Sequence, residues 1–271
     1  MAVDTHILPK MGYGTWMRRG RNGQRSVEEA LEIGYRHIDT AQGYENEAIC
    51  GLAIERSGLA RKDVFITTKV KPQNLGRSLF LPTVEESLVR LRTDHVDMLL
   101  IHWPSPKDEF PLESYIEDLA QARGRGYAKH VGLSNFTKPL LLAAEKIAGA
   151  GIISNLQIEI HPFHQNRAMV DFCRDRGIHI TAFSPLALGR VVGDPDISRI
   201  ASKRRATPSQ IALAYLMAKN FAVIPASSKP EHMRENFAAA AIELSPEEMN
   251  QMDGLDTGLR LLNPEHAPLW D

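Results

Sequence analysis

Eight short apolar segments recur along the chain, and helical patterns separate most of them. The segments span 11–15, 35–39, 64–69, 96–102, 130–134, 154–159, 179–184 and 221–225. Short apolar runs bounded by turn residues are typical of buried parallel strands. Apolar residues recur at helical spacing over 26–33, 47–57, 81–91, 112–123, 139–148, 167–175 and 208–219. This alternation predicts a parallel sheet, and eight repeats predict its closure into an eight-stranded β/α (TIM) barrel.

Three of the expected helices carry explicit start signals. Ser26, Thr207 and Ser245 are each followed three residues later by Glu or Gln, which is the spacing of a capping box. After Thr207 and Ser245 a proline occupies the first helical position, where its missing N–H would be unpaired in any case. The arginine-rich residues 18–25 are expected to form a solvated loop before the first helix.

The uninterrupted pattern also predicts the domain organisation. No linker rich in proline, glycine or serine divides the chain, so a single domain over residues 1–271 is expected. An open doubly wound sheet is the competing architecture. Gly12 and Gly14 begin its dinucleotide-binding fingerprint, but position 17 is methionine instead of the third glycine. A closed barrel also gives polar residues at the strand ends a common cavity, which offsets the cost of removing them from water.

The composition narrows the class further. Hydrophobic residues make up 43% of the 271 residues, enough for a sizeable core, and the formal charge of −1 gives no reason to expect nucleic acid or an anionic membrane as partner. No apolar run reaches the roughly 20 residues that span a bilayer, and no secretory signal is visible. Cys50 and Cys173 form no CxxC motif and are expected to be reduced core thiols, so we expect a cytoplasmic protein.

Four chemically complementary residues end or follow these apolar segments. Asp39, Lys69 and His102 close the second, third and fourth segments, and Tyr44 lies in the turn after Asp39. In a β/α barrel the carboxyl ends of the strands share one rim, where the chemistry takes place. A phenol with a pKa of about 10 is a poor acid at neutral pH, but a neighbouring ammonium lowers that pKa. The set therefore predicts Tyr44 as an acid tuned by Lys69, Asp39 as the anchor of that lysine, and His102 as a hydrogen-bond donor to a carbonyl group.

Each of these residues also has an ordinary structural explanation when it is taken singly. Asp39 could cap a turn, and Tyr44 could be an aromatic residue of the rim. Lys69 could extend to solvent, and His102 could be a hydrogen-bonded core histidine. Four complementary groups at one rim nevertheless favour a joint catalytic role over four independent structural ones.

The motifs around these residues resemble those of the aldo-keto reductase family. They are GYRHIDTA at 34–41, YENE at 44–47, ITTK at 66–69, LIHWP at 100–104 and GLSNF at 132–136, and the resemblance runs from Gly12 to the C-terminus. It implies a β/α barrel that reduces carbonyl groups with a nicotinamide cofactor. The catalytic roles of the family correspond to Asp39, Tyr44, Lys69 and His102 without substitution, in agreement with the roles that their chemistry predicts.

The resemblance also implies where the cofactor binds. Ser134, Asn135 and Gln157 would hold the nicotinamide carboxamide, and Phe183 would stack on the ring in place of the usual tyrosine. Alternatively, the three polar residues could simply satisfy backbone groups at the strand ends. Residues 184–188 would wrap the pyrophosphate. The expected cofactor contacts are Thr15, Trp16, Asp39, Ser134, Asn135, Gln157, Phe183, Ser184, Leu186, Ser227, Ser228, Lys229, His232 and Asn236.

The residues expected at the adenosine end depart from the family pattern. Ala226 stands where the Ile-Pro-Lys-Ser motif of the family has lysine, and His232 stands where an arginine would grip the 2′-phosphate. The loss of a guanidinium weakens phosphate recognition, which Lys229 could offset. We therefore expect NADPH as the cofactor, with relaxed discrimination against NADH.

The expected substrate pocket is aromatic. Aromatic walls with few polar anchors predict a small carbonyl substrate as the partner. His161 and His164 lack further ligands and are expected to be structural, so no metal site is predicted. The protein is expected to be a monomer that binds neither nucleic acid nor membrane. The expected substrate contacts are Trp16, Tyr44, His102 and Trp103, with Phe110 and Trp270 as further walls.

Two functions of other classes stay open at this point. Lys69 could form a Schiff base in a lyase, since buried barrel lysines can act in this way. Alternatively, the chain could be a non-catalytic regulatory protein that binds a nicotinamide cofactor. Trapping of a substrate on Lys69 by borohydride would favour the lyase, and cofactor binding without turnover would favour the regulatory protein.

Overall fold

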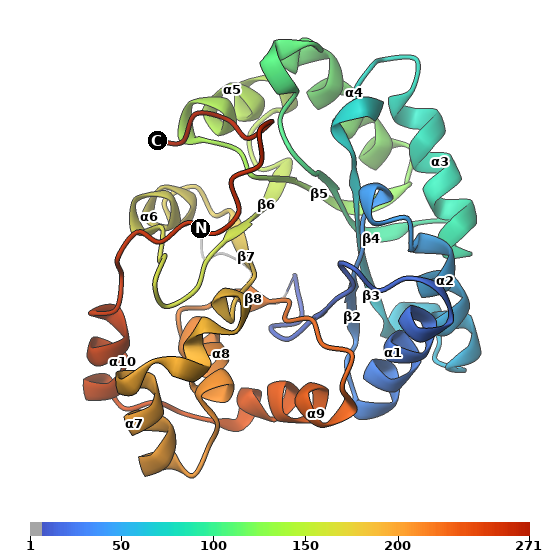
Figure 1. Cartoon of the computed structure of the whole chain (residues 1–271). Coiled ribbons are helices and arrows are strands. Elements are labelled where there is room, and N and C mark those ends of the chain that lie inside the picture. The colour runs from blue at the N-terminus through green and yellow to red at the C-terminus, as the bar shows by residue number, and fades with distance from the viewer. Residues whose placement is uncertain (1–6) are drawn as a thin grey trace.

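Each of the eight apolar segments overlaps a strand of one parallel sheet in the computed structural model, which describes residues 7–271. The strands are hydrogen-bonded in chain order from β1 to β8, so the predicted parallel arrangement is confirmed (Figure 1). They are β1 (Tyr13–Gly14), β2 (His37–Asp39), β3 (Phe65–Val70), β4 (Val96–Ile101), β5 (Ala128–Ser134), β6 (Ile153–Glu159), β7 (His179–Phe183) and β8 (Ala222–Val223).

Backbone hydrogen bonds between β1 and the region of β8 close the sheet into a barrel. Gly12 N donates to Val223 O at 2.8 Å, and Gly14 N donates to Pro225 O at 3.1 Å. A Cβ atom on Gly14 would lie 2.6 Å from the carbonyl oxygen of Ile224, so glycine is required for this close approach. Both strands are shorter than predicted, because Pro225 has no N–H with which to extend the ladder. The predicted barrel is confirmed.

Helices surround the strands and bury their apolar faces against them (Figure 1). In α3, for example, Leu81, Val84, Leu88 and Leu91 are buried, and this spacing places them on one helical face. The helices are α1 (Gly20–Ile33), α2 (Glu47–Arg56), α3 (Phe80–Leu91), α4 (Leu112–Gly124), α5 (Lys138–Ala148), α6 (Arg167–Arg174), α7 (Pro195–Arg204), α8 (Pro208–Ala218), α9 (Pro230–Ala238) and α10 (Pro246–Asp253).

Two of the three predicted helix starts are confirmed. Thr207 and Ser245 cap α8 and α10, and both capping boxes are complete. The prediction at Ser26 is wrong, because α1 already begins at Gly20 and the Ser26 hydroxyl donates to Gly23 O within the helix. Most of the arginine-rich segment is therefore helical, not a loop. A capping-box pattern is local, and it does not reveal whether the preceding residues have already entered a helix.

The helices α7 and α9 were not predicted from the sequence. Asp194 caps α7 by accepting hydrogen bonds from the backbone N–H groups of Asp196 and Ile197. α9 buries Met233 and Asn236, too few residues for a visible apolar period. Along residues 7–271, no helix has both the length and the apolar character that crossing a bilayer requires.

Candidate active site

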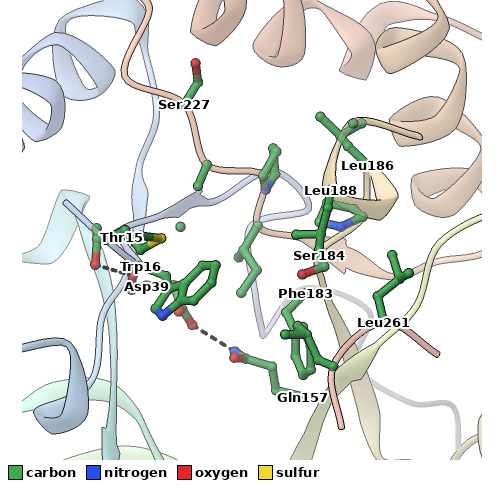
Figure 2. Close-up of a pocket in the computed structure, with 18 of the residues that line it drawn as sticks. Thr15, Trp16, Asp39, Gln157, Phe183, Ser184, Leu186, Leu188, Ser227 and Leu261 are labelled. Carbon is green, nitrogen blue, oxygen red and sulfur yellow. Dashed lines mark hydrogen bonds between the residues drawn. The ribbon is translucent and has the colours of Figure 1, made fainter. Parts of the chain in front are cut away.

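Polar residues at the carboxyl ends of the strands meet at one rim of the barrel. A cavity of about 1180 Å³ opens there. Asp39 ends β2 and Gln157 lies in β6, and Figure 2 shows the hydrogen bond between their side chains. Other predicted site residues that line the cavity are Tyr44, His102, Ser134, Asn135, Ser184 and Ser227.

Lys69 is fully buried and lies between two of the predicted catalytic residues. Its Nζ atom lies 2.5 Å from Asp39 Oδ1 and donates to the carbonyl oxygen of Thr40 at 2.8 Å. The same atom lies 3.5 Å from the hydroxyl oxygen of Tyr44 and 4.9 Å from the centre of its ring. The side chains of Lys69 and Asp39 are each 1% exposed, so water does not screen this ion pair. The ammonium therefore faces the phenol, as the proposed chemistry requires.

Two buried amides that were not predicted as site residues from the sequence hold the turn that carries Tyr44. This turn is the 3-10 helix η1 (Gln42–Tyr44). The side-chain oxygen of Gln42 accepts a hydrogen bond from Lys71 N at 3.1 Å. The side-chain nitrogen of Asn46 donates to the carbonyl oxygen of Thr15 at 2.7 Å. Both amides flank Tyr44 in the sequence, and their position in a turn was the available signal.

Burial determines the net direction of the Tyr44 pKa. Burial raises the pKa of the hydroxyl above its ordinary value, and the Lys69 ammonium offsets part of this rise. From the sequence, the cation was expected to dominate and to lower that pKa, and this expectation is wrong for the net direction. Burial alone would lower the pKa of Lys69, but the neighbouring Asp39 carboxylate and Tyr44 raise it. Tyr44 therefore keeps its proton and Lys69 its charge at neutral pH.

His102 follows β4 and lies beside the Tyr44 ring. The centres of the two rings are 5.4 Å apart in an edge-on arrangement. Burial, together with the positive charge of Lys69, lowers the pKa of His102 well below its ordinary value. The imidazole is therefore neutral at neutral pH, and one of its nitrogens carries a proton that can be donated to a ligand.

The residues expected around the nicotinamide lie on adjacent strands. Ser134 ends β5, Asn135 follows it, and Gln157 lies in β6; all three line the cavity together with Phe183. Asn135 Nδ2 donates to Ser134 Oγ at 3.0 Å, and Gln157 Nε2 donates to Asp39 Oδ2 at 2.8 Å. These amides thus stabilise other polar side chains of the rim while they also face the cavity.

Ser227, one of the residues expected near the adenosine, lies at the end of the cavity away from Gln157 (Figure 2). Ser228 and Lys229, in contrast, are not among the lining residues. The turn before α9 leaves both side chains exposed, and Lys229 N donates to Ser227 Oγ at 3.1 Å. Of the residues expected near the adenosine, Ser227, His232 and Asn236 line the cavity. The expected cofactor contacts Thr15 and Leu186 line it as well.

The aromatic residues divide into a lining group and a supporting group. Trp16 and Trp103 line the cavity, as expected for substrate contacts. Phe110 is not a lining residue; it packs so close to Gly76 that a Cβ there would lie 3.2 Å from its ring. Trp270 does not line the cavity either, and its ring lies 6.1 Å from that of Trp103 between centres. Trp270 therefore supports the wall through Trp103.

The histidine pair after β6 has structural contacts. His161 Nε2 lies 3.0 Å from Glu159 Oε1, and the backbones of His161 and His164 form an antiparallel bridge. Among residues 7–271, no three or more His, Cys, Asp or Glu side chains are grouped so that they could hold a metal ion.

The arrangement of an acid, a buried cation and a neutral imidazole at the rim of a barrel defines a class of enzymes. The sequence model of the aldo/keto reductase family matches residues 10–257. The chain therefore belongs to the aldo/keto reductase family and is an oxidoreductase that acts on carbonyl groups with a nicotinamide cofactor. The resemblance stated from the motifs is confirmed.

Two reductase sequences and one crystal structure are similar to this chain over nearly its whole length. Methylglyoxal reductase DkgB of Escherichia coli O157:H7 is 44% identical over 97% of this chain and 99% of its own. Aldo-keto reductase Rv2971 of Mycobacterium tuberculosis is 35% identical over 95% of this chain and 91% of its own. A crystal structure provisionally described as 2,5-diketo-D-gluconic acid reductase B has 36% identity and a TM-score of 0.93, and the match covers 97% of this chain and 94% of that one.

Proposed function

We propose that this protein is an NADPH-dependent reductase with Tyr44 as its general acid. The proposed substrates are small aldehydes, ketoaldehydes such as methylglyoxal, or diketo sugar acids, and the proposed unit is one barrel domain. One observation carries the proposal: Lys69 Nζ lies 2.5 Å from Asp39 and 3.5 Å from the Tyr44 hydroxyl. This geometry suits protonation of a carbonyl oxygen by a phenol whose conjugate base a cation stabilises.

The proposed reaction moves one proton through Tyr44. Neutral His102 donates a hydrogen bond to the carbonyl oxygen and orients it. Tyr44 gives its proton to that oxygen as negative charge develops there, and the phenolate that remains faces the ammonium of Lys69. Asp39 holds the ammonium in place, and a proton from solvent restores the phenol. The reduced nicotinamide, when bound, supplies the hydride for the carbonyl carbon.

The shape and lining of the cavity fit a dinucleotide. Its volume of about 1180 Å³ exceeds what a small carbonyl compound needs. Phe183 offers an aromatic face at the end that also holds the catalytic residues. Met17, Leu188 and Val192 line the mouth and are more than half exposed. Large apolar side chains around a cavity mouth support coverage by an extended ligand, since isolated proteins rarely expose such groups together.

NADPH is proposed over NADH because the ammonium of Lys229 and the imidazole of His232 adjoin the end of the cavity that contains Ser227. His232 lines this end, and exposed Lys229 is two residues from Ser227. Ala226, also a lining residue, offers no charge, so we expect only a modest preference. Because Lys229 is exposed and lies two residues from Ser227, its side chain is placed to approach a 2′-phosphate bound at this end of the cavity.

Lys229→Ala is expected to raise the KM for NADPH about fivefold, because an exposed charge pair contributes about 1 kcal/mol. The KM for NADH should not change, since NADH has no 2′-phosphate. Steady-state kinetics with both cofactors measures the two values. Lys62→Ala is a matched control, because Lys62 is an exposed cation that precedes β3 at the opposite end of the barrel. Equal effects on NADPH and NADH would contradict the proposed contact.

The proposed activity is tested with a panel of carbonyl compounds and both reduced cofactors. Methylglyoxal, small aldehydes and diketo sugar acids should oxidise NADPH with a higher catalytic efficiency than NADH. A catalytic efficiency with NADH that equals or exceeds that with NADPH would refute the cofactor assignment. Cofactor binding without turnover of any compound would favour the regulatory alternative.

The Schiff-base lyase is disfavoured by the ion pair. A lysine nucleophile must lose its proton before it attacks a carbonyl carbon. The Asp39 carboxylate at 2.5 Å stabilises the protonated form of Lys69. The expectations of a monomer and of a cytoplasmic location stay predictions.

A further inference from the structure

The C-terminal segment forms part of the cavity wall, although it belongs to no strand or helix. After α10 the chain runs past α6 and β6 and ends near α5 (Figure 1). A segment without a backbone ladder needs other partners if it is to form a wall of fixed shape. The residues of this segment that line the cavity are Leu261, Leu262, Asn263, Pro264 and His266.

A buried carboxylate meets this segment where its lining part begins. Glu159 is the last residue of β6, and it is 1% exposed. Its Oε1 atom accepts a hydrogen bond from Leu261 N at 2.7 Å, and its Oε2 atom accepts one from Leu262 N at 2.9 Å. His161 Nε2 lies 3.0 Å from Oε1. Strand β6 therefore carries both Gln157, which lines the cavity, and Glu159, which binds the backbone of the C-terminal segment.

The charge of Glu159 suits this contact. Burial would raise the pKa of Glu159, but the hydrogen bonds from His161 and the two backbone N–H groups outweigh burial and lower it. The group is thus an ionised acceptor, and hydrogen bonds to an ionised acceptor are stronger than neutral ones. Two consecutive N–H groups directed at one carboxylate fix the direction of the backbone, not only its distance.

Other contacts hold the chain upstream of the lining residues. Phe163 O accepts a hydrogen bond from Leu259 N at 2.9 Å. Gln165 Nε2 donates to Met252 O at 2.9 Å. The loop after β6 therefore tethers the end of α10 and the chain that follows it, whereas Glu159 bonds to two residues that themselves line the cavity.

We propose that Glu159 is a positioning residue that sets the substrate-side wall by holding the backbone of Leu261 and Leu262. It does not line the cavity, and it acts on the substrate through these two apolar residues. The binding of carbonyl substrates large enough to reach the wall therefore depends on Glu159, whereas the binding of the smaller methylglyoxal depends on it less. The kinetic consequence rests on the proposed reductase function, but the anchoring does not.

Glu159→Gln tests the proposal. Glutamine keeps the shape of the side chain but replaces one acceptor oxygen with an NH₂ donor, which must then face a donor. The KM for a bulky ketoaldehyde such as phenylglyoxal should rise about tenfold, and that for methylglyoxal about threefold or less. The kcat values and the Kd for NADPH should stay within about threefold, because the reacting groups are untouched. Hydrogen exchange at residues 261–262 should become faster.

Two control variants separate positioning from a loss of stability. Asp97, a buried carboxylate near the start of β4, forms an ion pair with Arg61 at the opposite end of the barrel. Asp97→Asn should lower stability and leave the ratio of the two KM values unchanged. In the double variant Glu159→Gln/Leu262→Ala, the ratio of the two KM values should differ little from that of Leu262→Ala alone, because the side chain that Glu159 positions is already removed.

The possible outcomes decide the proposal in each case. A folded Glu159→Gln protein with an unchanged KM ratio would overturn it, and so would the same ratio change in Asp97→Asn. If Glu159→Gln does not fold, hydrogen exchange of the wild-type protein decides. Amides of Leu261 and Leu262 that exchange more slowly than those of Asn263, Glu265 and His266 support the anchor, and equally fast exchange refutes it. A wild-type protein that reduces no carbonyl compound would refute the proposed function, while the exchange measurement would still decide the anchor.

Discussion

Tyr44→Phe is expected to lower kcat by roughly 10²- to 10⁴-fold, the range that a positioned general acid contributes. The substitution removes one oxygen atom, the one that lies 3.5 Å from Lys69 Nζ, and leaves the ring that packs against His102. Without that hydroxyl the carbonyl oxygen has no phenolic proton source at the moment when it becomes negative. Steady-state reduction of methylglyoxal with NADPH measures the loss.

The same variant should keep its affinity for the cofactor, because the lost interaction is made only in the transition state. Fluorescence titration with NADPH should give a Kd within about twofold of the wild type. Tyr215→Phe is a matched control. Its buried hydroxyl donates to Asp253 Oδ1 at 2.5 Å, and Tyr215 lies in α8, not among the residues that line the cavity. This control should keep full activity. Turnover by Tyr44→Phe at the wild-type rate would refute the acid assignment.

Lys69→Met is expected to impair both activity and stability. It removes the cation beside Tyr44, so the phenolate loses its stabilising charge and kcat should fall by at least about 10²-fold. It also leaves the Asp39 carboxylate buried without its ionic partner, which typically costs roughly 3–5 kcal/mol of unfolding free energy. Urea denaturation measures the second effect, and the assay used for Tyr44→Phe measures the first.

The double variant Asp39→Asn/Lys69→Met separates these two effects. It removes both charges of a pair that is closed to water, so it should recover much of the lost stability. Its activity should stay as low as that of Lys69→Met, because the cation is still absent. Equal stability of the single and double variants would contradict the buried ion pair, and wild-type kcat in either variant would contradict the tuning of Tyr44.

Local signals predicted much of the fold for identifiable reasons. Thr207 and Ser245 cap α8 and α10 with their own side chains, so a short sequence pattern was sufficient to place the starts of both helices. Strands such as β4 were visible because they are buried on both faces and carry mostly apolar side chains. The helix start predicted at Ser26 was wrong because the preceding residues decide whether a serine caps a helix or lies inside one. α9 buries only Met233 and Asn236, and the three buried residues of α7 lie within little more than one turn, so neither helix presents a sustained apolar period.

The candidate site was predictable to the extent that strand order places side chains. Asp39, Lys69 and His102 were expected at one rim because they end consecutive strands, and the short distances between Lys69, Asp39 and Tyr44 agree with that reasoning. The aromatic wall was less predictable. Loops, not strands, carry Phe110 and Trp270, and periodicity does not determine where a loop places a side chain.

The sequence by itself determined the class of fold, the rim at which the candidate groups meet and the residues proposed to react, because strand alternation and residue chemistry are local properties. Only the tertiary structure decided the net direction of the Tyr44 pKa, since burial is a property of the whole assembly. It also decided the contacts of Gln157 with Asp39 and of Glu159 with Leu261 and Leu262. Residues more than a hundred positions apart meet there because the barrel brings its strand ends and its tail together, and no local pattern records that meeting.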